Sequence, residues 1–390
     1  MTRPAKFAED LKECGISFAA GVPDSLLKEF CSCISDTEGI THVTAANEGG
    51  AVALAIGRYL ATAEPALVYM QNSGIGNALN PLISLADAEV YGIPMVLLVG
   101  WRGRPGTDDE PQHAKQGKAT IPLLEAAGIE CIILPKEEEE AAAALRRAVD
   151  LTKEKGQPVA LIVEKGTFEK SEGTAATPAP EPEMGREEAI EAILNAAPEG
   201  TVTVSTTGMI SREIYEIRER RKEPHSGDFL CVGGMGHASQ IALAIAISRP
   251  DRNVLCIEGD GAVIMHSGSL GITASKAPGN FVHAILNNGA HDSVGGQRTI
   301  GLDIDLPKIA EGFGYKSALS ASTMEELKEI LRKARSLQRP ILIEARVRKG
   351  ARKNLGRPPR DMHEAKRAAM EYMNAQSALG LEGRSNGAEP

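Results

Sequence analysis

Asp260 and Asn288 have the residue types and the spacing to hold a hard metal cation. Asp260 lies between Gly259 and Gly261 just after the apolar run NVLCI, and Asn288 follows the next such run, FVHAIL. An Asp and an Asn at the carboxyl ends of neighbouring parallel strands would offer the oxygen ligands that Mg2+ prefers, and flanking glycines let the backbone come close to a diphosphate. Either turn alone is an ordinary structural feature, but the two together predict a metal–diphosphate site.

Glu48 is the single acid in the otherwise apolar, small-residue stretch 43–57. Asn47 before it can cap a helix, and the helix dipole favours an acid in the first turn. The same carboxylate, held against apolar residues, could make a hydrogen bond that is stronger than in water. The residues alone leave a structural and a functional role open.

The elements that must position these residues alternate between strand-like and helix-like segments. Apolar runs such as PALVYM and IPMVLLV end at small or polar residues, and a Pro-, Ala-, Thr- and Glu-rich stretch divides two such halves. Strands that alternate with helices predict parallel sheets covered by helices, with ligands at the carboxyl ends of the strands. We expect an α/β fold of two open parallel-sheet domains, 1–168 and 185–349, joined by a linker, 169–184. A polar tail, 350–390, should form a short surface helix and a disordered end.

The composition argues against several classes of protein. The net charge of −9 disfavours a nucleic-acid partner, which needs a basic face. No apolar run approaches the ~20 residues of a membrane span, and the opening MTRPAKFAEDLKECG lacks the apolar core of a signal peptide. The six cysteines include no CxxC pair, a pattern that is typical of a protein whose thiols are reduced. We expect a cytoplasmic protein with no membrane partner.

The GDG and NN turns at this interval resemble the metal–diphosphate motif of thiamine-diphosphate-dependent enzymes. The resemblance implies thiamine diphosphate and Mg2+ as cofactors. It implies that Asp260, Asn288 and the main-chain oxygen of Ala290 bind the metal, and that Gly259 and Gly261 lie at the diphosphate.

The same resemblance gives roles to GGMGHA, residues 233–238, and to Glu48. Met235 would lie under the bend of the cofactor, and the Gly233 carbonyl would accept a hydrogen bond from its 4′-amine. Glu48 would hydrogen-bond N1′ of the aminopyrimidine and so help activate the cofactor. A dinucleotide site is disfavoured, because residues 234–239 read G-x-G-x-x-S and are expected before a strand rather than after one.

Two domains without the middle domain of most 2-oxo acid decarboxylases resemble the phosphonopyruvate and sulfopyruvate decarboxylases of this family. GVPDSLL, YMQNSGIGNALNPLISL, VYGIPMVLLVGWRGRPGTDDEPQH and GGQRT carry the resemblance, which covers the chain except for the linker and the tail. It implies the thiamine-diphosphate-binding fold and decarboxylation of a small anionic 2-oxo acid, 3-phosphonopyruvate, to phosphonoacetaldehyde and CO2. It also implies a homo-oligomer with the active site at the subunit interface. The alternatives are a sulfopyruvate decarboxylase, another thiamine-diphosphate-dependent decarboxylase or carboligase, and a non-catalytic cofactor-binding or nucleotide-binding protein.

An anionic substrate of this kind needs cationic and polar receptors at the carboxyl ends of the strands. Arg104 stands where we expect an acid in the family, which makes its loop more cationic. His237 and His291 could handle protons. Each of these side chains could instead be solvated or make only structural hydrogen bonds. The candidate substrate contacts are Asp24, Ser25, Asn72, Ser73, Arg102, Arg104 and His113.

Overall fold

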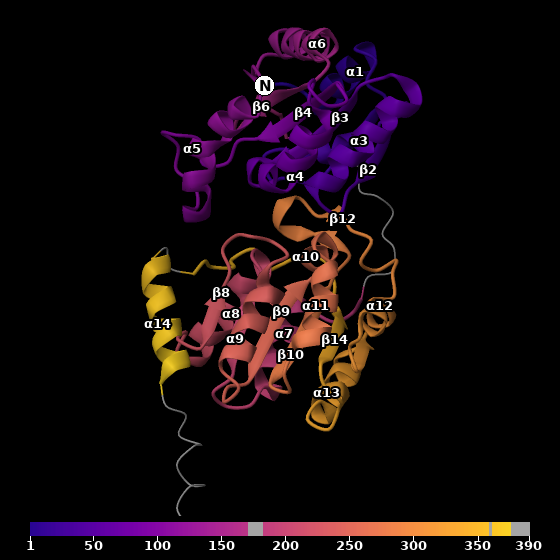
Figure 1. Cartoon of the computed structure of the whole chain (residues 1–390). Coiled ribbons are helices and arrows are strands. Elements are labelled where there is room, and N and C mark those ends of the chain that lie inside the picture. The colour runs from indigo at the N-terminus through magenta and orange to yellow at the C-terminus, as the bar shows by residue number, and fades with distance from the viewer. Residues whose placement is uncertain (171–181, 359–360, 376–390) are drawn as a thin grey trace, which may run out of the picture. The chain divides into compact units, whose positions relative to one another are not determined.

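The computed structural model describes residues 1–170, 182–358 and 361–375, which form two α/β units (Figure 1). The first unit is Met1–Ala179 together with Ala290–Thr299, and the second is Pro180–Gly289 together with Ile300–Pro390. The division falls inside the predicted linker, most of which lies outside the described residues. The end of the predicted tail, 376–390, lies outside them too.

The first unit is built on a six-stranded sheet in which every pairing is parallel. The strand order is β2-β1-β3-β4-β6-β5, so β5 lies at an edge and pairs with β6, the last strand of the sheet in the chain. The segment Ala290–Thr299 adds a small antiparallel pair of β11 (Ala290–His291) and β12 (Gln297–Arg298). The six strands are β1 (Phe18–Gly21), β2 (Thr41–Thr44), β3 (Ala66–Gln71), β4 (Met95–Gly100), β5 (Glu130–Ile133) and β6 (Pro158–Val163).

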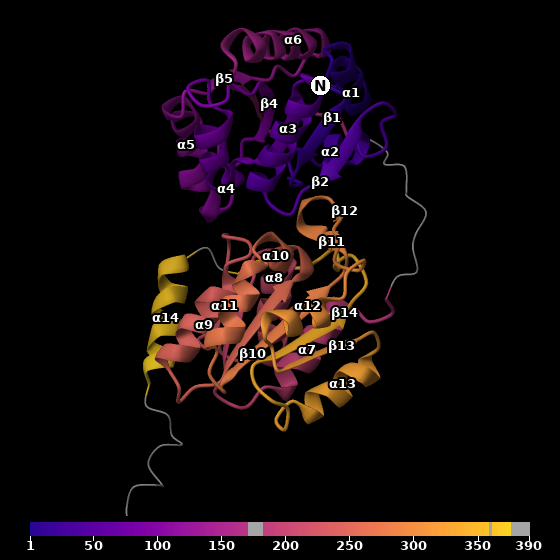
Figure 2. The same ribbon diagram turned by 45° about the vertical axis from the view of Figure 1, so that its right-hand side comes forward.

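Helices cover both faces of this sheet, as the two views show (Figures 1 and 2). Successive residues of β4 point to opposite faces, and each face has its own hydrophobic core: Val96 and Leu98 belong to one, Leu97 and Val99 to the other. Burial on both sides explains why these strands read as continuous apolar runs. One face carries α1 (Pro4–Glu13), α2 (Lys28–Ile34) and α6 (Glu138–Lys155). The other carries α3 (Glu48–Thr62), α4 (Ile75–Pro81), a π-helical turn (Leu82–Ala86) and α5 (Pro111–Ala126).

The second unit repeats the architecture on another wholly parallel six-stranded sheet. The order is β13-β14-β10-β9-β7-β8, so β13 is an edge strand that pairs with the later β14. Two open parallel sheets covered by helices confirm the predicted fold class. The strands are β7 (Val202–Ser205), β8 (Asp228–Leu230), β9 (Val254–Gly259), β10 (Phe281–Asn287), β13 (Ser317–Ala321) and β14 (Ile341–Arg346).

The helices of the second unit also form two layers around its sheet (Figure 2). One layer consists of α7 (Arg186–Ala196), α8 (Met209–Arg221) and α13 (Met324–Lys333). The other includes α9 (Ala238–Ser248), α10 (Asp260–Met265), α11 (Gly268–Lys276) and α12 (Leu306–Phe313). The predicted surface helix of the tail is present as α14 (Met362–Asn374), which packs Tyr372 against the core beside β8.

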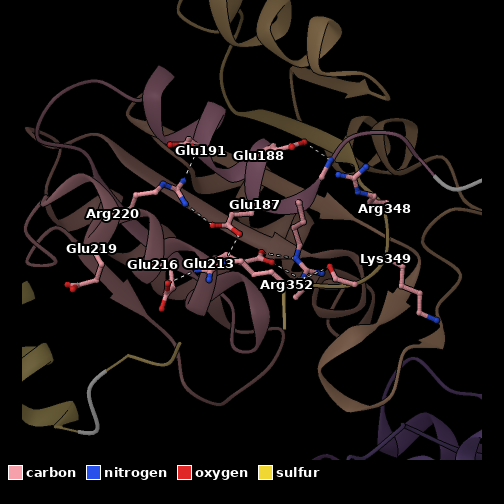
Figure 3. A pocket seen from close by; sticks show the side chains of 14 residues that line it. Glu187, Glu188, Glu191, Glu213, Glu216, Glu219, Arg220, Arg348, Lys349 and Arg352 are labelled. Carbon is pink, nitrogen blue, oxygen red and sulfur yellow. Dashed lines mark hydrogen bonds and ion pairs between the residues drawn. The ribbon is translucent and has the colours of Figure 1, made fainter. Parts of the chain in front are cut away.

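A network of ion pairs joins the chain segment after β14 to α7 and α8 (Figure 3). Arg186 and Glu213 form a bidentate ion pair with contacts of 2.8 and 2.9 Å, and both side chains are buried. Arg352 bridges Glu187 and Glu216. These residues line a surface hollow of about 1040 Å³, where Arg220 also pairs with Glu187 and Glu191, and none of the predicted site residues lines it. We therefore assign this hollow a structural role.

No helix among the described residues has the length and apolar character to cross a membrane.

Candidate active site

The predicted site residues of the first unit lie just beyond the carboxyl ends of its strands. Because all strands of the sheet run parallel, these ends share one edge. Asp24 and Ser25 follow β1, Glu48 opens the helix after β2, and the other candidates follow β3 and β4. The edge of one sheet thus brings together residues that are far apart in the sequence.

Glu48 is a buried carboxylate at the first position of α3. Asn47 caps the helix by accepting a hydrogen bond of 2.8 Å from the Gly50 N–H, so the structural role predicted for this pair is present. The Glu48 side chain is only 5% exposed, and its Oε2 accepts a hydrogen bond of 2.7 Å from Asn77 Nδ2. Burial raises the pKa of Glu48 above its ordinary value, and the bond from Asn77 opposes that rise.

The backbone around Glu48 is shaped to receive its carboxylate. A Cβ on Gly74 would lie 2.3 Å from Glu48 Oε1, and one on Gly49 would lie 2.8 Å from the Asn77 carbonyl oxygen. Both positions therefore need glycine for α3 and α4 to approach this closely. A carboxylate held by the Asn77 amide in a mainly apolar setting suits a group that must hydrogen-bond a heterocyclic nitrogen.

Asp24 is completely buried at the end of β1. Its Oδ2 accepts a hydrogen bond of 3.0 Å from the Leu26 N–H, and Ser25 Oγ donates to Oδ1 at 3.5 Å. A Cβ on Gly100, the last residue of β4, would lie 2.1 Å from Asp24 Oδ2, so glycine is required there. Burial raises the pKa of Asp24 to about 6, against the effects of these hydrogen bonds and of the nearby Arg102.

Arg102 is held by a carboxylate of its own loop. Its guanidinium makes a bidentate pair with Asp109 and donates a further hydrogen bond of 2.7 Å to Ser25 Oγ. Asp109 also accepts 2.8 Å hydrogen bonds from the N–H groups of Gly103 and Glu110. Burial opposes ionisation of Asp109, but the bonds from Arg102 and the backbone lower its pKa below the ordinary value. Arg102 is thus oriented in advance beside Asp24 and Ser25.

Arg104 is placed differently from Arg102. Its Nε contacts Glu164 Oε1 at 3.0 Å just beyond the end of β6, and its guanidinium lies 5.8 Å from the centre of the Trp101 ring. The Arg104 side chain is 45% exposed. The cation that we expected to make this loop more basic is therefore paired with an acid.

His113 lies in a helix, unlike Arg102 and Arg104, which lie in the loop before it. It occupies the first turn of α5, which begins at Pro111, a residue whose fixed φ and missing N–H suit a first helical position. The ring is buried, and its Nδ1 has no hydrogen-bond partner among the described residues. Burial and the positive charge of Arg102 lower the pKa of His113 to about 4, so the ring is neutral at pH 7.

Asn72 and Ser73 follow β3 and differ in what they contact. Asn72 is buried, and its Nδ2 donates to the Arg102 carbonyl oxygen at 2.8 Å and to Thr120 Oγ1 at 2.9 Å. This amide joins the β4–α5 loop to α5 and so positions the backbone of Arg102. Ser73 is exposed and accepts a hydrogen bond of 2.6 Å from Gln71 Nε2.

In the second unit, Asp260 and Asn288 follow β9 and β10, which are neighbours in the sheet. Asp260 is the first residue of α10 and is buried, as is Asn288. Asn287 uses its Nδ2 for bonds of 2.7 Å to the Gly301 carbonyl oxygen and 2.6 Å to Glu344 Oε1. A Cβ on Gly301 would lie 2.4 Å from Asp260 Oδ2. The donor set and the glycine cradle fit a magnesium–diphosphate group, and the amide of Asn287 is engaged in structural hydrogen bonds.

The GGMGHA segment follows a strand, which contradicts the expectation from the sequence that it would precede one. It lies between β8 and α9, and Gly234 and Gly236 have φ values of 68° and 81°. A Cβ on Gly236 would lie 2.6 Å from His266 Cδ2. A dinucleotide site is still disfavoured, because the two strands of such a unit are neighbours, whereas β7 separates β8 from β9.

Three histidines lie near these motifs. The rings of His237 and His266 are 4.7 Å apart, and His237 Nδ1 lies 3.1 Å from the Met235 carbonyl oxygen. Burial lowers the pKa of His291 to about 4. Ala290 and His291 form β11, in the segment that groups with the first unit. The proposed metal role of the Ala290 oxygen and the proton-handling roles of these rings stay predictions.

The sequence reading missed the partners that hold the candidate residues in place. These are Asn77 and Gly74 beside Glu48, Asp109 beside Arg102, and Glu164 beside Arg104. Asn77 lies in the stretch NSGIGNALNP, whose two glycines and three asparagines after a buried strand were the available signal. The acids that pair with the arginines left no such signal, because acidic residues are common throughout the chain.

Comparisons with known proteins match both units to one family. Residues 1–126 match the thiamine pyrophosphate enzyme N-terminal TPP binding domain, and residues 204–345 match the corresponding C-terminal TPP binding domain. The chain is 34% identical over 378 residues to a phosphonopyruvate decarboxylase of Streptomyces hygroscopicus, covering 92% of this chain and 90% of that protein. A phosphonopyruvate decarboxylase of Streptomyces viridochromogenes is 33% identical, with 92% and 91% covered. A sulfopyruvate decarboxylase of Methanosarcina acetivorans is 29% identical, with 88% and 91% covered.

Proposed function

The chain belongs to the thiamine pyrophosphate enzymes, in the group that contains the phosphonopyruvate decarboxylases, and on this premise we propose that it converts 3-phosphonopyruvate to phosphonoacetaldehyde and CO2. The observation that carries the proposal is the similarity to two phosphonopyruvate decarboxylases along 92% of the chain. It spans both cofactor-binding domains and the loop of Arg102, so it includes the residues expected to select the substrate.

The residues of both units fit the two cofactors. Asp260 and Asn288, with the main-chain oxygen of Ala290, would hold Mg2+ and through it the diphosphate. Glu48 would hold the aminopyrimidine, and Met235 would support the bend. When bound, thiamine diphosphate supplies the nucleophilic carbon that attacks the keto group and the electron sink that accepts the electrons released with CO2.

Glu48 contributes a carboxylate whose position and proton affinity are both set by the protein. Burial makes its charged form costly, and the Asn77 amide offsets part of that cost. The result is a hydrogen-bonding partner for a ring nitrogen that is stronger than a solvated carboxylate would be. This supports Glu48 as the residue that activates the cofactor.

The cluster of Asp24, Ser25 and Arg102 is the proposed receptor for the substrate. Arg102 is fixed by Asp109 on one side and still donates to Ser25 on the other, so the hydroxyl and the guanidinium can bind the oxygens of one phosphonate. With a pKa of about 6, Asp24 exchanges a proton readily near neutral pH, which suits a group that handles a proton at the reacting carbon.

Sulfopyruvate is the second candidate substrate, favoured by the relative that is 29% identical over 88% of this chain. A sulfonate carries one negative charge fewer than a fully ionised phosphonate. The positive charge of Arg102 should attract the more highly charged phosphonate more strongly, and the pairing with Asp109 moderates this preference without reversing it.

We also propose a homo-oligomer in which the cofactor lies between subunits. In support, α3, the helix that begins at Glu48, exposes Leu60 to 72% and Leu54 to 38%. Gly50, Ala53 and Leu54 line a shallow, mainly apolar hollow of about 620 Å³. Small residues in such a hollow would let another chain approach the helix closely.

All six cysteines lie in the described part of the chain without a disulfide, which supports the proposed cytoplasmic location.

The test is a decarboxylation assay on the purified chain. Phosphonopyruvate, sulfopyruvate and pyruvate are offered separately, with and without thiamine diphosphate and Mg2+, and CO2 and aldehyde are measured. We expect turnover of phosphonopyruvate that depends on both cofactors, with kcat/KM at least ~10-fold higher than for sulfopyruvate, which corresponds to about 1.4 kcal/mol.

Glu48→Gln and the matched control Glu139→Gln complete the experiment. Glu139 is exposed near the start of α6, so its variant should keep wild-type turnover. Glu48→Gln should lower kcat by ~10²-fold or more, as is typical when a positioned acid–base group is lost. A preference for sulfopyruvate or pyruvate would overturn the proposed substrate, and full activity of Glu48→Gln would overturn the proposed role of this carboxylate.

A further inference from the structure

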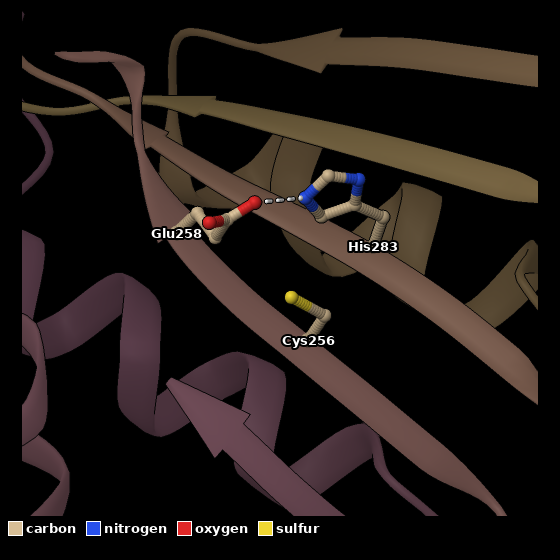
Figure 4. A group of neighbouring side chains, drawn as sticks. All are labelled: Cys256, Glu258 and His283. Atoms are coloured by element: carbon tan, nitrogen blue, oxygen red, sulfur yellow. Dashed lines mark hydrogen bonds and ion pairs between the residues drawn. The ribbon is translucent and has the colours of Figure 1, made fainter. Parts of the chain in front are cut away.

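Three side chains that can bind a metal meet in the interior of the second unit, outside the residues assigned to the cofactors. Cys256 and Glu258 lie two apart on β9, and His283 on β10 is the direct parallel partner of Cys256. Residues two apart on a strand share a face, and so do partners in register, so the three side chains project to the same side of the sheet. Figure 4 shows them converging from the two neighbouring strands.

The three potential ligand atoms are close together and shielded from water. The Cys256 sulfur, a Glu258 oxygen and a His283 ring nitrogen all lie within 4.8 Å of one another. Cys256 and His283 are completely buried, and Glu258 is 1% exposed. A tetrahedral zinc with metal–ligand bonds of ~2.0–2.3 Å would bring such atoms to roughly 3.5 Å from each other, so small side-chain rotations suffice.

Glu258 has one oxygen that the protein does not satisfy. Its Oε2 lies 3.1 Å from His283 Nε2, but its Oε1 is buried without a hydrogen-bond partner among the described residues. An unsatisfied buried acceptor is costly, and a carboxylate oxygen especially so. A ligand in this interior cluster would remove that cost.

We propose that Cys256, Glu258 and His283 form a binding site for one zinc ion. Zn2+ is commonly coordinated by thiolate, imidazole and carboxylate ligands together. Mg2+ is coordinated by oxygen ligands and binds thiolates poorly. One thiolate and one carboxylate neutralise the dication, so the occupied site carries no net charge into the apolar core. On binding, the S–H bond of Cys256 breaks, its proton is released to solvent, and the sulfur bonds to the metal.

The surroundings of His283 match those of a metal-bound histidine. Its other ring nitrogen, Nδ1, lies 2.9 Å from the Tyr315 hydroxyl, so Nε2 is the nitrogen that faces the cluster. Metal-bound histidines usually have the second nitrogen held by such an outer partner. Burial raises the pKa of Tyr315, so its hydroxyl stays neutral beside the site.

The site would join the two strands that carry the magnesium motif. Asp260 lies two residues after Glu258, and Asn288 lies five residues after His283. A zinc ion bonded to β9 and β10 would hold those strand ends at a fixed separation. The inference does not depend on which 2-oxo acid the enzyme uses.

The test measures metal binding rather than turnover. The full chain, expressed without chelator, is assayed for bound metals by elemental analysis, then stripped and titrated with Co2+ as a spectroscopic substitute for zinc. We expect about one zinc per chain and, with Co2+, a thiolate-to-cobalt charge-transfer band in the near ultraviolet together with the visible bands of tetrahedral cobalt.

Variants assign the signal to these residues. Cys256→Ser should abolish the charge-transfer band, and His283→Gln and Glu258→Gln should weaken Co2+ affinity by ~10-fold or more. Cys31→Ser, a buried cysteine of the first unit, and Asp260→Asn, in the proposed magnesium site, are the matched controls and should keep the band. Circular dichroism checks that each variant is folded.

Two results would overturn the proposal. One is a wild-type chain that contains no zinc and binds Co2+ without a thiolate band. The other is a folded Cys256→Ser variant that keeps the wild-type spectrum and affinity, because the metal would then lie elsewhere. Either result leaves the proposed decarboxylase activity untouched, and an inactive protein with the expected cobalt spectrum would leave the zinc site standing.

Discussion

Gly74→Ala should displace the Glu48 carboxylate. The new Cβ would lie 2.3 Å from Glu48 Oε1 and 2.5 Å from Cγ, whereas ordinary contact begins at 3.4 Å. The carboxylate must therefore retreat by about 1 Å, which also breaks its 2.7 Å hydrogen bond to Asn77. If Glu48 activates the cofactor as proposed, a displacement of 1 Å should lower the rate by up to ~10²-fold, and overpacking at such a position costs about 1–3 kcal/mol of stability.

The assay compares kcat and cofactor affinity of Gly74→Ala with those of Gly76→Ala. Gly76 lies two residues further along the chain, and a Cβ there would have nothing within 4 Å. Its variant gains helix propensity and should keep wild-type kcat. The reasoning is refuted if Gly74→Ala, shown to be folded by its thermal transition, keeps wild-type kcat and cofactor affinity. It is also refuted if both variants lose activity equally.

Three further changes test the neighbouring groups. The pKa of Asp24, about 6, lies above its ordinary value of 3.8, so the folded state binds the proton more tightly and loses stability as the pH rises through this range. The full loss is about 3 kcal/mol, of which about 2 kcal/mol falls between pH 4.5 and pH 7. Asp24→Asn should abolish that loss, measured by urea unfolding at pH 4.5 and pH 7, and an unchanged pH dependence would contradict the assignment. Arg102→Lys should raise KM for phosphonopyruvate by ~10-fold, because Lys cannot make the bidentate pair with Asp109. Arg104 is more exposed, and Arg104→Lys should change KM by less than ~3-fold. Equal effects of the two substitutions would refute the proposal that Arg102, and not Arg104, binds the substrate. Asn77→Leu removes the bond that lowers the pKa of Glu48, so the acid limb of the kcat/KM–pH profile should move to higher pH, and a shift to lower pH would contradict this cause.

Local patterns were enough to predict where the candidate site residues lie. Each buried parallel strand is an apolar run that ends at a polar or small residue, so Asp260, Asn288 and Asn72 could be assigned to strand ends from the sequence. Glu48 was predictable at a helix start because Asn47 is a capping residue with a local signal. The periodicity of apolar residues, the length of an apolar run and the helix-capping residues are local features that extend over a few residues. They can therefore be recognised in a single sequence.

Features that depend on short elements or on register could not be predicted in the same way. β8 has three residues, too few for a recognisable apolar run, so the GGMGHA segment was assigned to the wrong side of a strand. The pairing of Arg102 with Asp109 depends on how the β4–α5 loop folds back on itself. The meeting of Cys256 with His283 depends on the register between β9 and β10, which the sequence of neither strand specifies.

The order of the strands has a consequence for the chain during synthesis. In each sheet the next-to-last strand in the chain is an edge strand that attaches through the last one: β5 through β6, and β13 through β14. Until Val163 has left the ribosome, β5 has no partner, and the apolar β4 exposes an unpaired edge. At ~5–20 residues per second this state lasts for a few seconds. A nascent or truncated chain that stops just before β6 or β14 therefore exposes an unpaired strand edge, which can pair with another chain. The growing polypeptide is most prone to aggregation at these two stages of its synthesis, before β6 and before β14 are complete.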